Sequence, residues 1–288
     1  MTAIYVILIV AAVLVLLYFL MIMPRLTRQQ DWKQFPKVYY AHRGLHDNHT
    51  EAPENSMAAF KKAVAAGYGI ELDVQLTKDR IPVVFHDFTL QRATGKSGKV
   101  CEYTYEELQE FPLFESEERI PKFENVLAVV NGRVPLIVEI KLEWMDLMVC
   151  TLTNRALADY KGQYCIESFN PLALMWYRRY RNDVLRGQLS DGFLKTGEFK
   201  GPLYFILQNL LLNWMTKPDF VAYDHKYADS LSRRLCRKLY HNMAVAWTIK
   251  SQKELEEAEK NFDMFIFDSF IPRRKRPKQK QGKGRAEF

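Results

Sequence analysis

The sequence predicts an α/β fold, a (β/α)8 barrel behind one apolar N-terminal helix. Between residues 38 and 272, short apolar runs alternate with amphipathic helical stretches, which is the pattern of βαβ units. The alternation covers about 235 residues, a length that suits eight such units. With 48% hydrophobic and 26% charged residues, the chain is too apolar to be disordered. A doubly wound open sheet would produce the same alternation and is the alternative.

Residues 1–24 form a predicted transmembrane anchor. No charged side chain precedes Arg25, and the residues from Ala3 to Met23 are almost wholly apolar. At about 1.5 Å per residue, such a helix crosses the ~30 Å hydrocarbon layer. A cleaved signal peptide is the alternative, but it requires a basic leading segment and a shorter apolar core of ~7–15 residues.

Residues 25–37 form a predicted juxtamembrane linker that sets the orientation. It contains four cations, which are Arg25, Arg28, Lys33 and Lys37. Because cations flanking a membrane span concentrate on the cytoplasmic side, we expect a single-pass protein of the cell membrane with its folded domain in the cytoplasm.

The formal net charge of +7 is concentrated in residues 273–288, a predicted disordered tail. This segment has eight Lys and Arg residues against the single Glu287, so the preceding chain is neutral overall. The basic balance therefore does not indicate a specific nucleic-acid surface on the folded domain. Contact of the tail with anionic membrane lipids, at ~1 kcal/mol per cation, and simple solvation are the two interpretations.

Nine strands and five helices are predicted in the barrel region. The strands are Val38–His42, Ile70–Leu76, Ile81–His86, Leu136–Lys141, Tyr164–Phe169, Asp183–Leu189, Phe220–Tyr223, Val245–Ile249 and Met264–Phe267. The helices are Glu54–Ala66, Leu142–Asp159, Pro171–Tyr180, Ala228–Tyr240 and Ser251–Asn261. The stretch Gly201–Thr216 has its polar residues within one arc, which indicates a helix at the bilayer interface or one that covers the barrel.

Ionisable residues gather where the first four predicted strands end. In a barrel, the C-terminal ends of the strands converge on one mouth, where chemistry is expected. Side chains two apart on a strand share a face, so Glu71 points with Asp73, and Glu139 points with Lys141. The remaining members of this group are His42, Arg43 and His86.

This set of residues predicts a metal-assisted reaction at a phosphate. Three carboxylates in one low-dielectric mouth repel each other unless a cation neutralises them, and their oxygens suit Mg²⁺ or Ca²⁺. Two histidines can accept and donate protons near neutral pH, and the guanidinium of Arg43 matches a phosphate group. Together these groups predict phosphodiester cleavage, although each residue alone also fits a structural role.

Ordered motifs strengthen this hypothesis. They are Ala41-His42-Arg43-Gly44, Pro53-Glu54-Asn55-Ser56, Ile70-Glu71-Leu72-Asp73-Val74, Val83-Val84-Phe85-His86-Asp87 and Val138-Glu139-Ile140-Lys141. By the order and spacing of these motifs, the chain resembles the glycerophosphodiester phosphodiesterase family. The resemblance is specific from Tyr40 to Lys141 and looser from there to Pro272. The resemblance implies a (β/α)8 barrel over residues 38–272, related to phosphatidylinositol-specific phospholipase C, with a small insertion at 88–119 after the second strand.

The resemblance also implies residue roles. The implied metal ligands are Glu71, Asp73 and Glu139, the acid/base pair is His42 and His86, and the phosphate contacts are Arg43 and Lys141. Glu54 is either an acid beside the site or a carboxylate in the first turn of a helix. Trp247 is either a cleft residue or a core aromatic. Asp268 departs from the family's usual closing motif, and we favour the interpretation that it ends a strand over a role at the mouth. His46 and His49 are interpreted as loop residues.

The implied activity is hydrolysis of glycerophosphodiesters to glycerol 3-phosphate and an alcohol at the membrane surface. Two alternatives differ from it in substrate or in function. The first is a lysophospholipase D-type cleavage of membrane lysophospholipids, including a route through a cyclic phosphate. The second is a membrane-tethered protein that binds glycerophosphodiesters without turnover.

Overall fold

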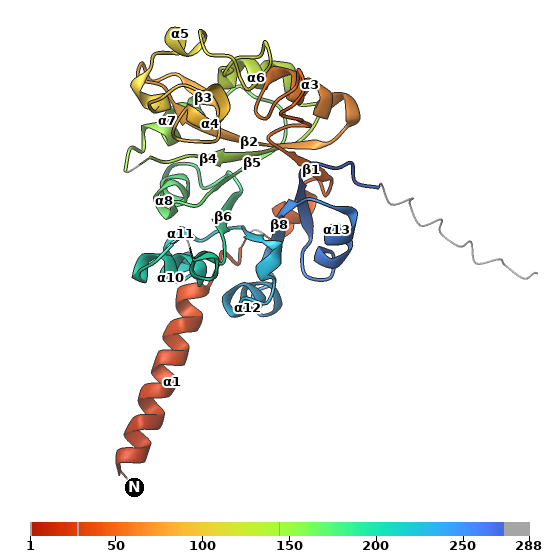
Figure 1. Ribbon diagram of the computed structural model, residues 1–288. Helices are drawn as coiled ribbons and strands as arrows, with labels where there is room; N and C mark the ends of the chain where they lie inside the picture. The colour runs from red at the N-terminus through yellow and green to blue at the C-terminus, as the bar shows by residue number, and fades with distance from the viewer. Residues whose placement is uncertain (1, 28, 144, 198, 274–288) are drawn as a thin grey trace, which may run out of the picture.

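The computed structural model forms a closed parallel barrel with one long helix projecting from it (Figure 1). It describes residues 2–27, 29–143, 145–197 and 199–273, so the predicted tail lies outside the described residues beyond Arg273. The barrel strands are β1 (Tyr39–His42), β2 (Gly69–Leu76), β4 (Leu136–Ile140), β5 (Tyr164–Ser168), β6 (Arg186–Ser190), β7 (Phe220–Asp224), β8 (Met243–Ile249) and β9 (Met264–Phe267).

The closure of the sheet confirms the barrel and excludes the open sheet. Strand β1 pairs in parallel with β2 on one side and with β9 on the other, so the eight parallel strands form a ring. The predicted strand Ile81–His86 is shorter than expected, because only β3 (Pro82–Val84) pairs, and it lies antiparallel on β2. This hairpin adds a ninth strand outside the ring.

The helices cover the outside of the ring, except the first, which projects away from it (Figure 1). They are α1 (Thr2–Ile22), α2 (Gln29–Gln34), α3 (Met57–Ala66), α4 (Gln91–Thr94), η1 (Val100–Glu102), α5 (Tyr105–Leu108), α6 (Phe123–Val130), α7 (Met148–Ala156), α8 (Pro171–Tyr180), α9 (Phe193–Thr196), α10 (Pro202–Gln208), α11 (Asn213–Thr216), η2 (His225–Tyr227), α12 (Leu231–Lys238) and α13 (Gln252–Ala258). Helix α8 has the predicted bounds, with Asn170 as its N-cap and proline at its first position.

The other predicted helices differ from the structure. Leu142–Asp159, Ala228–Tyr240 and Ser251–Asn261 are helical only over α7, α12 and α13, so each of them is shorter than predicted. Helix α3 begins at Met57 rather than at Glu54, because the hydroxyl of Ser56 accepts a hydrogen bond from Ala59 N and caps the helix there. The stretch Gly201–Thr216 is not one helix. It is broken into α10 and α11 at Leu210, whose φ of 57° is left-handed.

Aromatic side chains fill part of the barrel interior. Trp32 of α2, within the predicted linker, is buried and stacks on Phe220 of β7 with 4.6 Å between ring centroids. A Cβ at Gly187 of β6 would lie 2.1 Å from the Phe220 ring, so this position requires glycine. The other faces of the strands pack against the helices, and every residue of β2 and β4 is buried.

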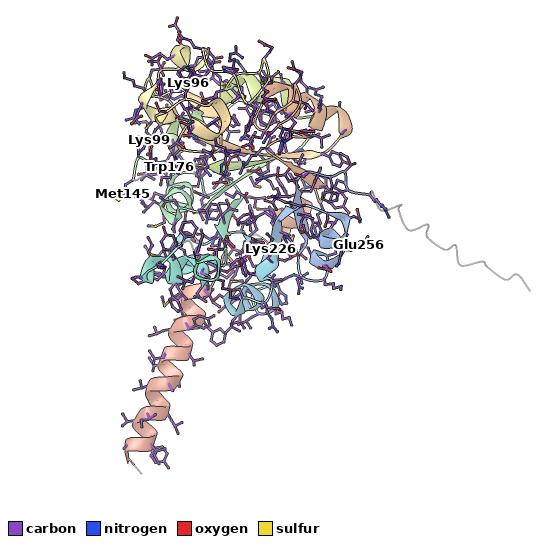
Figure 2. The ribbon with its side chains drawn as sticks, viewed as in Figure 1. Lys96, Lys99, Met145, Trp176, Lys226 and Glu256 are labelled. Atoms are coloured by element: carbon purple, nitrogen blue, oxygen red, sulfur yellow. The ribbon has the colours of Figure 1, made fainter. Side chains whose placement is uncertain are left out.

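The segment 88–119 contains α4, η1 and α5 and packs around a small core of its own. The buried members of this core are Val83, Phe85, Leu90, Ala93, Val100, Leu108, Leu113 and Ile120. Figure 2 labels Lys96 and Lys99 of this segment on the side of the barrel away from α1. The insertion and the long helix are therefore on opposite sides of the ring.

Candidate active site

Three carboxylates meet inside the barrel. Glu71 and Asp73 lie on β2 and Glu139 on β4, where Asp73 is the register partner of Glu139. All three are buried, and one carboxylate oxygen from each lies within 4.8 Å of the others. The structure thus brings together the three acids that the sequence predicts as metal ligands.

The electrostatics of this cluster reflect crowded negative charge. Burial, followed by the charges of Asp73 and Glu139, raises the pKa of Glu71 well above its ordinary value. Burial also raises the pKa of Glu139, although the Lys141 charge opposes it. Burial acts in the same direction on Asp73, but the charges of His86 and Lys141 outweigh it and lower the pKa of that carboxyl. The acids therefore favour a bound cation.

Two side-chain cations border the cluster. Lys141 Nζ lies 3.0 Å from Glu139 Oε1 and 3.6 Å from Asp73 Oδ1. Arg43 Nε lies 3.6 Å from Asp73 Oδ2, and the backbone N–H of Arg43 donates to Glu71 Oε2 at 3.1 Å. Arg43 has a left-handed φ of 53°, a strained turn that directs this N–H at the cluster. The cluster therefore has three acidic groups beside two basic ones.

Each of the two predicted histidines faces a carboxylate through Nδ1. His42 Nδ1 lies 3.2 Å from Asp268 Oδ2, and His86 Nδ1 lies 2.6 Å from Asp87 Oδ1. His42 Nε2 is on the cluster side, 4.0 Å from Glu71 Oε2. A carboxylate at Nδ1 selects the tautomer and leaves Nε2 for proton transfer. Burial, followed by the charge of Arg43, lowers the pKa of His42 to about 4, while Asp268 opposes the shift.

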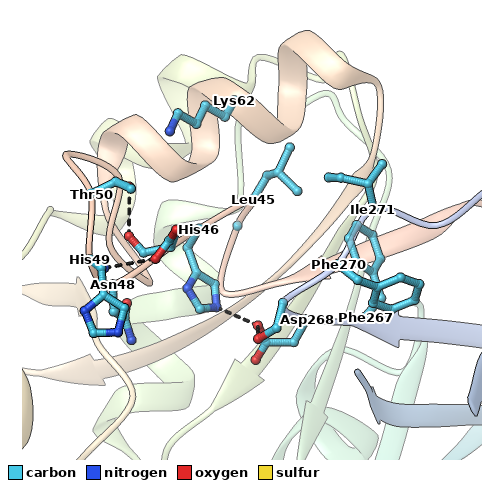
Figure 3. Close-up of a pocket in the computed structure, with 13 residues that line it drawn as sticks. Leu45, His46, Asn48, His49, Thr50, Lys62, Phe267, Asp268, Phe270 and Ile271 are labelled. Atoms are coloured by element: carbon cyan, nitrogen blue, oxygen red, sulfur yellow. Dashed lines mark hydrogen bonds and ion pairs between the residues drawn. The ribbon is translucent and has the colours of Figure 1, made fainter. Parts of the chain in front are cut away.

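Asp268 joins two histidines beside a cavity of about 620 Å³. It directly follows β9, as expected for a residue that ends a strand, but its carboxylate also lies 3.2 Å from His46 Nε2. Figure 3 shows His46 pointing from the loop after β1 toward Asp268. The interpretation of His46 as a plain loop residue missed this contact, because the partners are far apart in the chain. The sequence signal that could have indicated this contact is the position of Asp268, a polar residue at the end of a barrel strand.

Replacing Asp268 by asparagine is expected to lower kcat by about 10- to 100-fold with a smaller change in KM, because His42 loses the carboxylate that orients it. Steady-state kinetics of Asp268→Asn against Asp183→Asn, an exposed acid that pairs with Arg181, measures this. Wild-type kcat in Asp268→Asn would mean that Asp268 only ends the strand.

Glu54 connects the mouth to the insertion. It lies before α3, so it is not a carboxylate of the first helical turn. Arg43 donates to Glu54 Oε1 at 2.7 Å, and Arg92 of the insertion donates to both Glu54 oxygens at 2.6 and 3.0 Å. Arg92 also donates to Asp87 Oδ2 at 2.6 Å, so it reaches the partner of His86. No local pattern in the sequence marks Arg92, so its role depends on the fold.

The Glu54 network predicts a pH-dependent stability. Burial alone would raise the pKa of Glu54, but hydrogen bonds from Arg92 and the charge of Arg43 lower it from 4.5 to about 2. A lowered carboxyl pKa stabilises the fold above pH 4.5, and this contribution is lost as the pH falls toward 2. The melting temperature of Glu54→Gln should therefore be below that of wild type at pH 7, and the difference should shrink on acidification. A constant difference from pH 7 to 3 would contradict the ionised bridge.

A fourth buried acid was missed by sequence analysis. Glu167 of β5 is the register partner of Glu139, and its Oε2 accepts no hydrogen bond from the described residues. Burial, followed by the charges of Glu139 and Asp73, raises its pKa well above the ordinary value. The sequence signal that could have indicated Glu167 is a glutamate inside an apolar strand. Glu139 in Val138-Glu139-Ile140 has the same kind of position.

Trp247 of β8 is half-buried and contacts Phe169, with 5.5 Å between ring centroids. It packs against the cluster of buried residues that contains Phe220, and part of its surface is exposed. This indole is one end of a row of rings that continues through Phe169 to Phe193.

Comparisons with known proteins agree with this geometry. A family model described as the glycerophosphoryl diester phosphodiesterase family matches residues 42–269. Glycerophosphodiester phosphodiesterase 1 of Mus musculus is 34% identical over 274 residues, which cover 80% of this chain and 77% of that protein. A glycerophosphodiester phosphodiesterase of Bacillus altitudinis is 45% identical over 111 residues, 36% of this chain, and the match spans only 44% of that protein.

A solved structure is similar over most of the chain. The phosphodiesterase of Oleispira antarctica, in complex with the product sn-glycerol-3-phosphate, has a TM-score of 0.66 and 22% identity. The similarity covers 82% of this chain and 94% of that protein. At this identity, the likeness supports the barrel fold.

Proposed function

The chain belongs to the glycerophosphoryl diester phosphodiesterase family, and from this premise we propose that it hydrolyses glycerophosphodiesters to glycerol 3-phosphate and an alcohol. One observation carries the proposal. Glu71, Asp73 and Glu139 converge within 4.8 Å, and a histidine held by its own carboxylate lies on each of β1 and the β3 hairpin. This arrangement combines a cation site with two groups that can transfer protons.

The acidic cluster fits a hard divalent cation such as Mg²⁺ or Ca²⁺. Its donors are carboxylate oxygens, and Asp73 Oδ1 accepts no hydrogen bond from the described residues although it is buried. Glu71, Asp73 and Glu139 would hold the ion. When bound, a divalent ion supplies charge that stabilises a phosphate oxygen and a nearby hydroxyl.

The remaining residues bind the substrate and move protons. Arg43 and Lys141 present positive charge beside the cluster, where the phosphate of the diester would be oriented. Of His42 and His86, one imidazole accepts the proton of the nucleophile and the other donates a proton to the leaving alcohol oxygen. Water and the neighbouring glycerol hydroxyl are the two possible nucleophiles, and the second leads through a cyclic phosphate.

A lysophospholipid is a second candidate substrate, favoured by the row of aromatic rings. Trp247 contacts Phe169 at 5.5 Å, Phe169 contacts Phe193 at 6.1 Å, and Phe193 contacts Tyr204 at 5.7 Å. Tyr204 lies on α10, so apolar surface continues from β8 inside the barrel to an outer helix. An acyl chain could lie along this apolar surface and be removed from water, whereas a deacylated headgroup has no apolar chain to bury there.

Turnover rather than binding alone is supported by the two histidines. A protein that only bound glycerophosphodiesters would have no need for two imidazoles that are each oriented by a carboxylate. We also propose that α1 anchors the barrel in the cell membrane, with the barrel on the cytoplasmic side. The support is its 20-residue apolar stretch Ala3–Ile22, followed by the cations of residues 25–37.

The substrate is tested by comparing glycerophosphocholine with lysophosphatidylglycerol in the presence of Mg²⁺ or Ca²⁺. Phosphorus NMR of the product separates glycerol 3-phosphate from a cyclic phosphate. For a lipid substrate, Tyr204→Ala should lower kcat/KM for the lysophospholipid by about fivefold and leave glycerophosphocholine unaffected. The exposed Tyr180 supplies the control variant Tyr180→Ala. Activity on neither substrate would contradict the proposal.

A further inference from the structure

Helix α10 packs Tyr204 against Phe193 but leaves other apolar side chains exposed. Five of its seven residues have large apolar or aromatic side chains, and none of its residues, all of them described, is buried. Leu203 and Phe205 are more than half exposed, and Trp214 of the adjacent α11 is 49% exposed. A helix on the surface of a soluble barrel normally turns such residues inward. Exposed apolar side chains gathered on neighbouring elements are typical of an interaction site.

The base of α1 is held at the same place in the fold. Ile22, at the end of α1, is fully buried, and its carbonyl accepts a hydrogen bond from Asn213 Nδ2 of α11 at 3.1 Å. Lys217 Nζ donates to the carbonyl of Met23 at 3.2 Å, and Arg25 N donates to the carbonyl of Pro218 at 3.0 Å. Helix α1 therefore leaves the body in a fixed direction, next to α11.

Helix α12 crosses α1 on the other side. The hydroxyls of Tyr18 and Ser232 are 2.8 Å apart, and the Tyr240 hydroxyl donates to the carbonyl of Phe19 at 2.9 Å. Two adjacent residues of α1 thus contact Ser232 near the start of α12 and Tyr240 just after its end, so the two helices cross rather than run side by side. Figure 1 shows α10 and α12 flanking the end of α1 that joins the barrel.

The exposed side of α12 combines apolar and basic residues. Leu231 and Leu239 are more than half exposed, and Arg234 and Lys238 are exposed between them. At helical spacing these four positions share one face. Leucines mixed with cations are typical of helices that lie in the interface of an anionic membrane.

The length of α1 determines how close α10, α11 and α12 lie to the membrane. The apolar stretch Ala3–Ile22 has 20 residues, which rise about 30 Å, the thickness of the hydrocarbon layer. Only Ala3–Leu17 is exposed throughout, and this part rises about 22 Å. To cross the layer, the helix must also use the segment from Tyr18 to Ile22, which α11 and α12 contact. The elements around that segment would then lie at the level of the headgroups.

We propose that α10, Trp214 and the exposed face of α12 form a collar around the base of α1 that sits in the interface of an anionic phospholipid bilayer. The collar rests on the proposed anchoring by α1 and is independent of the basic tail. It orients the barrel with the insertion pointing away from the membrane, because the two lie on opposite sides of the ring (Figure 1). It also brings the outer end of the aromatic row, at Tyr204, to the lipid surface.

Spin labels test the collar in the full chain. Single cysteines are introduced as Leu203→Cys and Leu239→Cys in a Cys101→Ser background, because Cys101 is the exposed cysteine and the other three are buried. Leu14→Cys reports on α1, and the exposed Met145→Cys is the matched control, away from α1 in Figure 2. The protein is reconstituted in vesicles of phosphatidylcholine with or without phosphatidylglycerol, and collisions with oxygen and a water-soluble nickel complex are measured.

The expected ratio of oxygen to nickel collisions at Leu203→Cys and Leu239→Cys lies between the high value at Leu14→Cys and the low value at Met145→Cys. It should rise at Leu239→Cys when phosphatidylglycerol is present. If both collar labels match Met145→Cys while Leu14→Cys is in lipid, the collar is overturned and the anchor stands. A water-exposed Leu14→Cys label would overturn the anchor and the collar together.

Discussion

Replacing Asp73 by asparagine is expected to abolish hydrolysis and, in the same variant, to remove the stabilisation that divalent ions give the wild-type fold. Asp73 is buried among Glu71, Glu139 and two cations, and one of its oxygens accepts no hydrogen bond from the described residues. A ligand that binds only the folded state stabilises it by about 2.7 kcal/mol at a concentration of 100 times Kd. Asparagine keeps the shape of the side chain but removes the charge that attracts the ion.

The measurement pairs activity with thermal melting. Wild type is expected to lose activity in a chelator, to regain it with Mg²⁺ or Ca²⁺, and to melt at a higher temperature with the ion than without it. Asp73→Asn should show neither the activity nor the shift. Asp183→Asn, an exposed acid that pairs with Arg181, is the matched control and should behave as wild type. Full activity of chelator-treated wild type would show that the acidic cluster is not a metal site.

The double variant of His42→Ala and His86→Ala is expected to be inactive, and each single variant should lose about 10²- to 10⁴-fold in kcat. The two imidazoles act in one proton-transfer sequence, so the losses should be far from additive. His42 and His86 each form their side-chain contact with a carboxylate at the mouth of the barrel and do not belong to the hydrophobic core. The variants should therefore fold.

His49→Ala is the matched control, since this histidine is exposed in the loop that follows β1. Its activity should equal that of wild type. Circular dichroism of each variant checks the fold, and single-turnover kinetics measures the chemical step. If the double variant keeps its full activity and resists chelation, the reaction uses another site.

Local patterns in the sequence were enough to find most of the strands and seven residues of the candidate site. Met264–Phe267 and Pro171–Tyr180 have their predicted bounds, because apolar runs and an Asn-Pro helix start are signals within a few residues. Glu71 with Asp73, and Glu139 with Lys141, share a face because side chains alternate along a strand. That rule needs no tertiary information.

Other parts of the site depend on contacts between distant segments. Asp268 meets His42 across 226 positions, and Arg92 of the insertion meets Glu54 across 38. The helix break at Leu210 and the burial of Trp32 against Phe220 likewise arise from packing. No periodicity records such pairs, so the roles of Asp268 and Arg92 could not be assigned beforehand.

By itself, the sequence determined the alternating α/β architecture, the apolar N-terminal segment and the acids, bases and imidazoles of the mouth, because each depends on spacing along one strand or helix. Only the tertiary structure decided that the sheet closes, with β1 between β2 and β9. The pairing of β2, β4 and β5 brings the four buried acids together. Closure through β1 and β9 then places His42 beside both Glu71 and Asp268. Such placement depends on the ring of strands as a whole, which no single segment of the chain encodes.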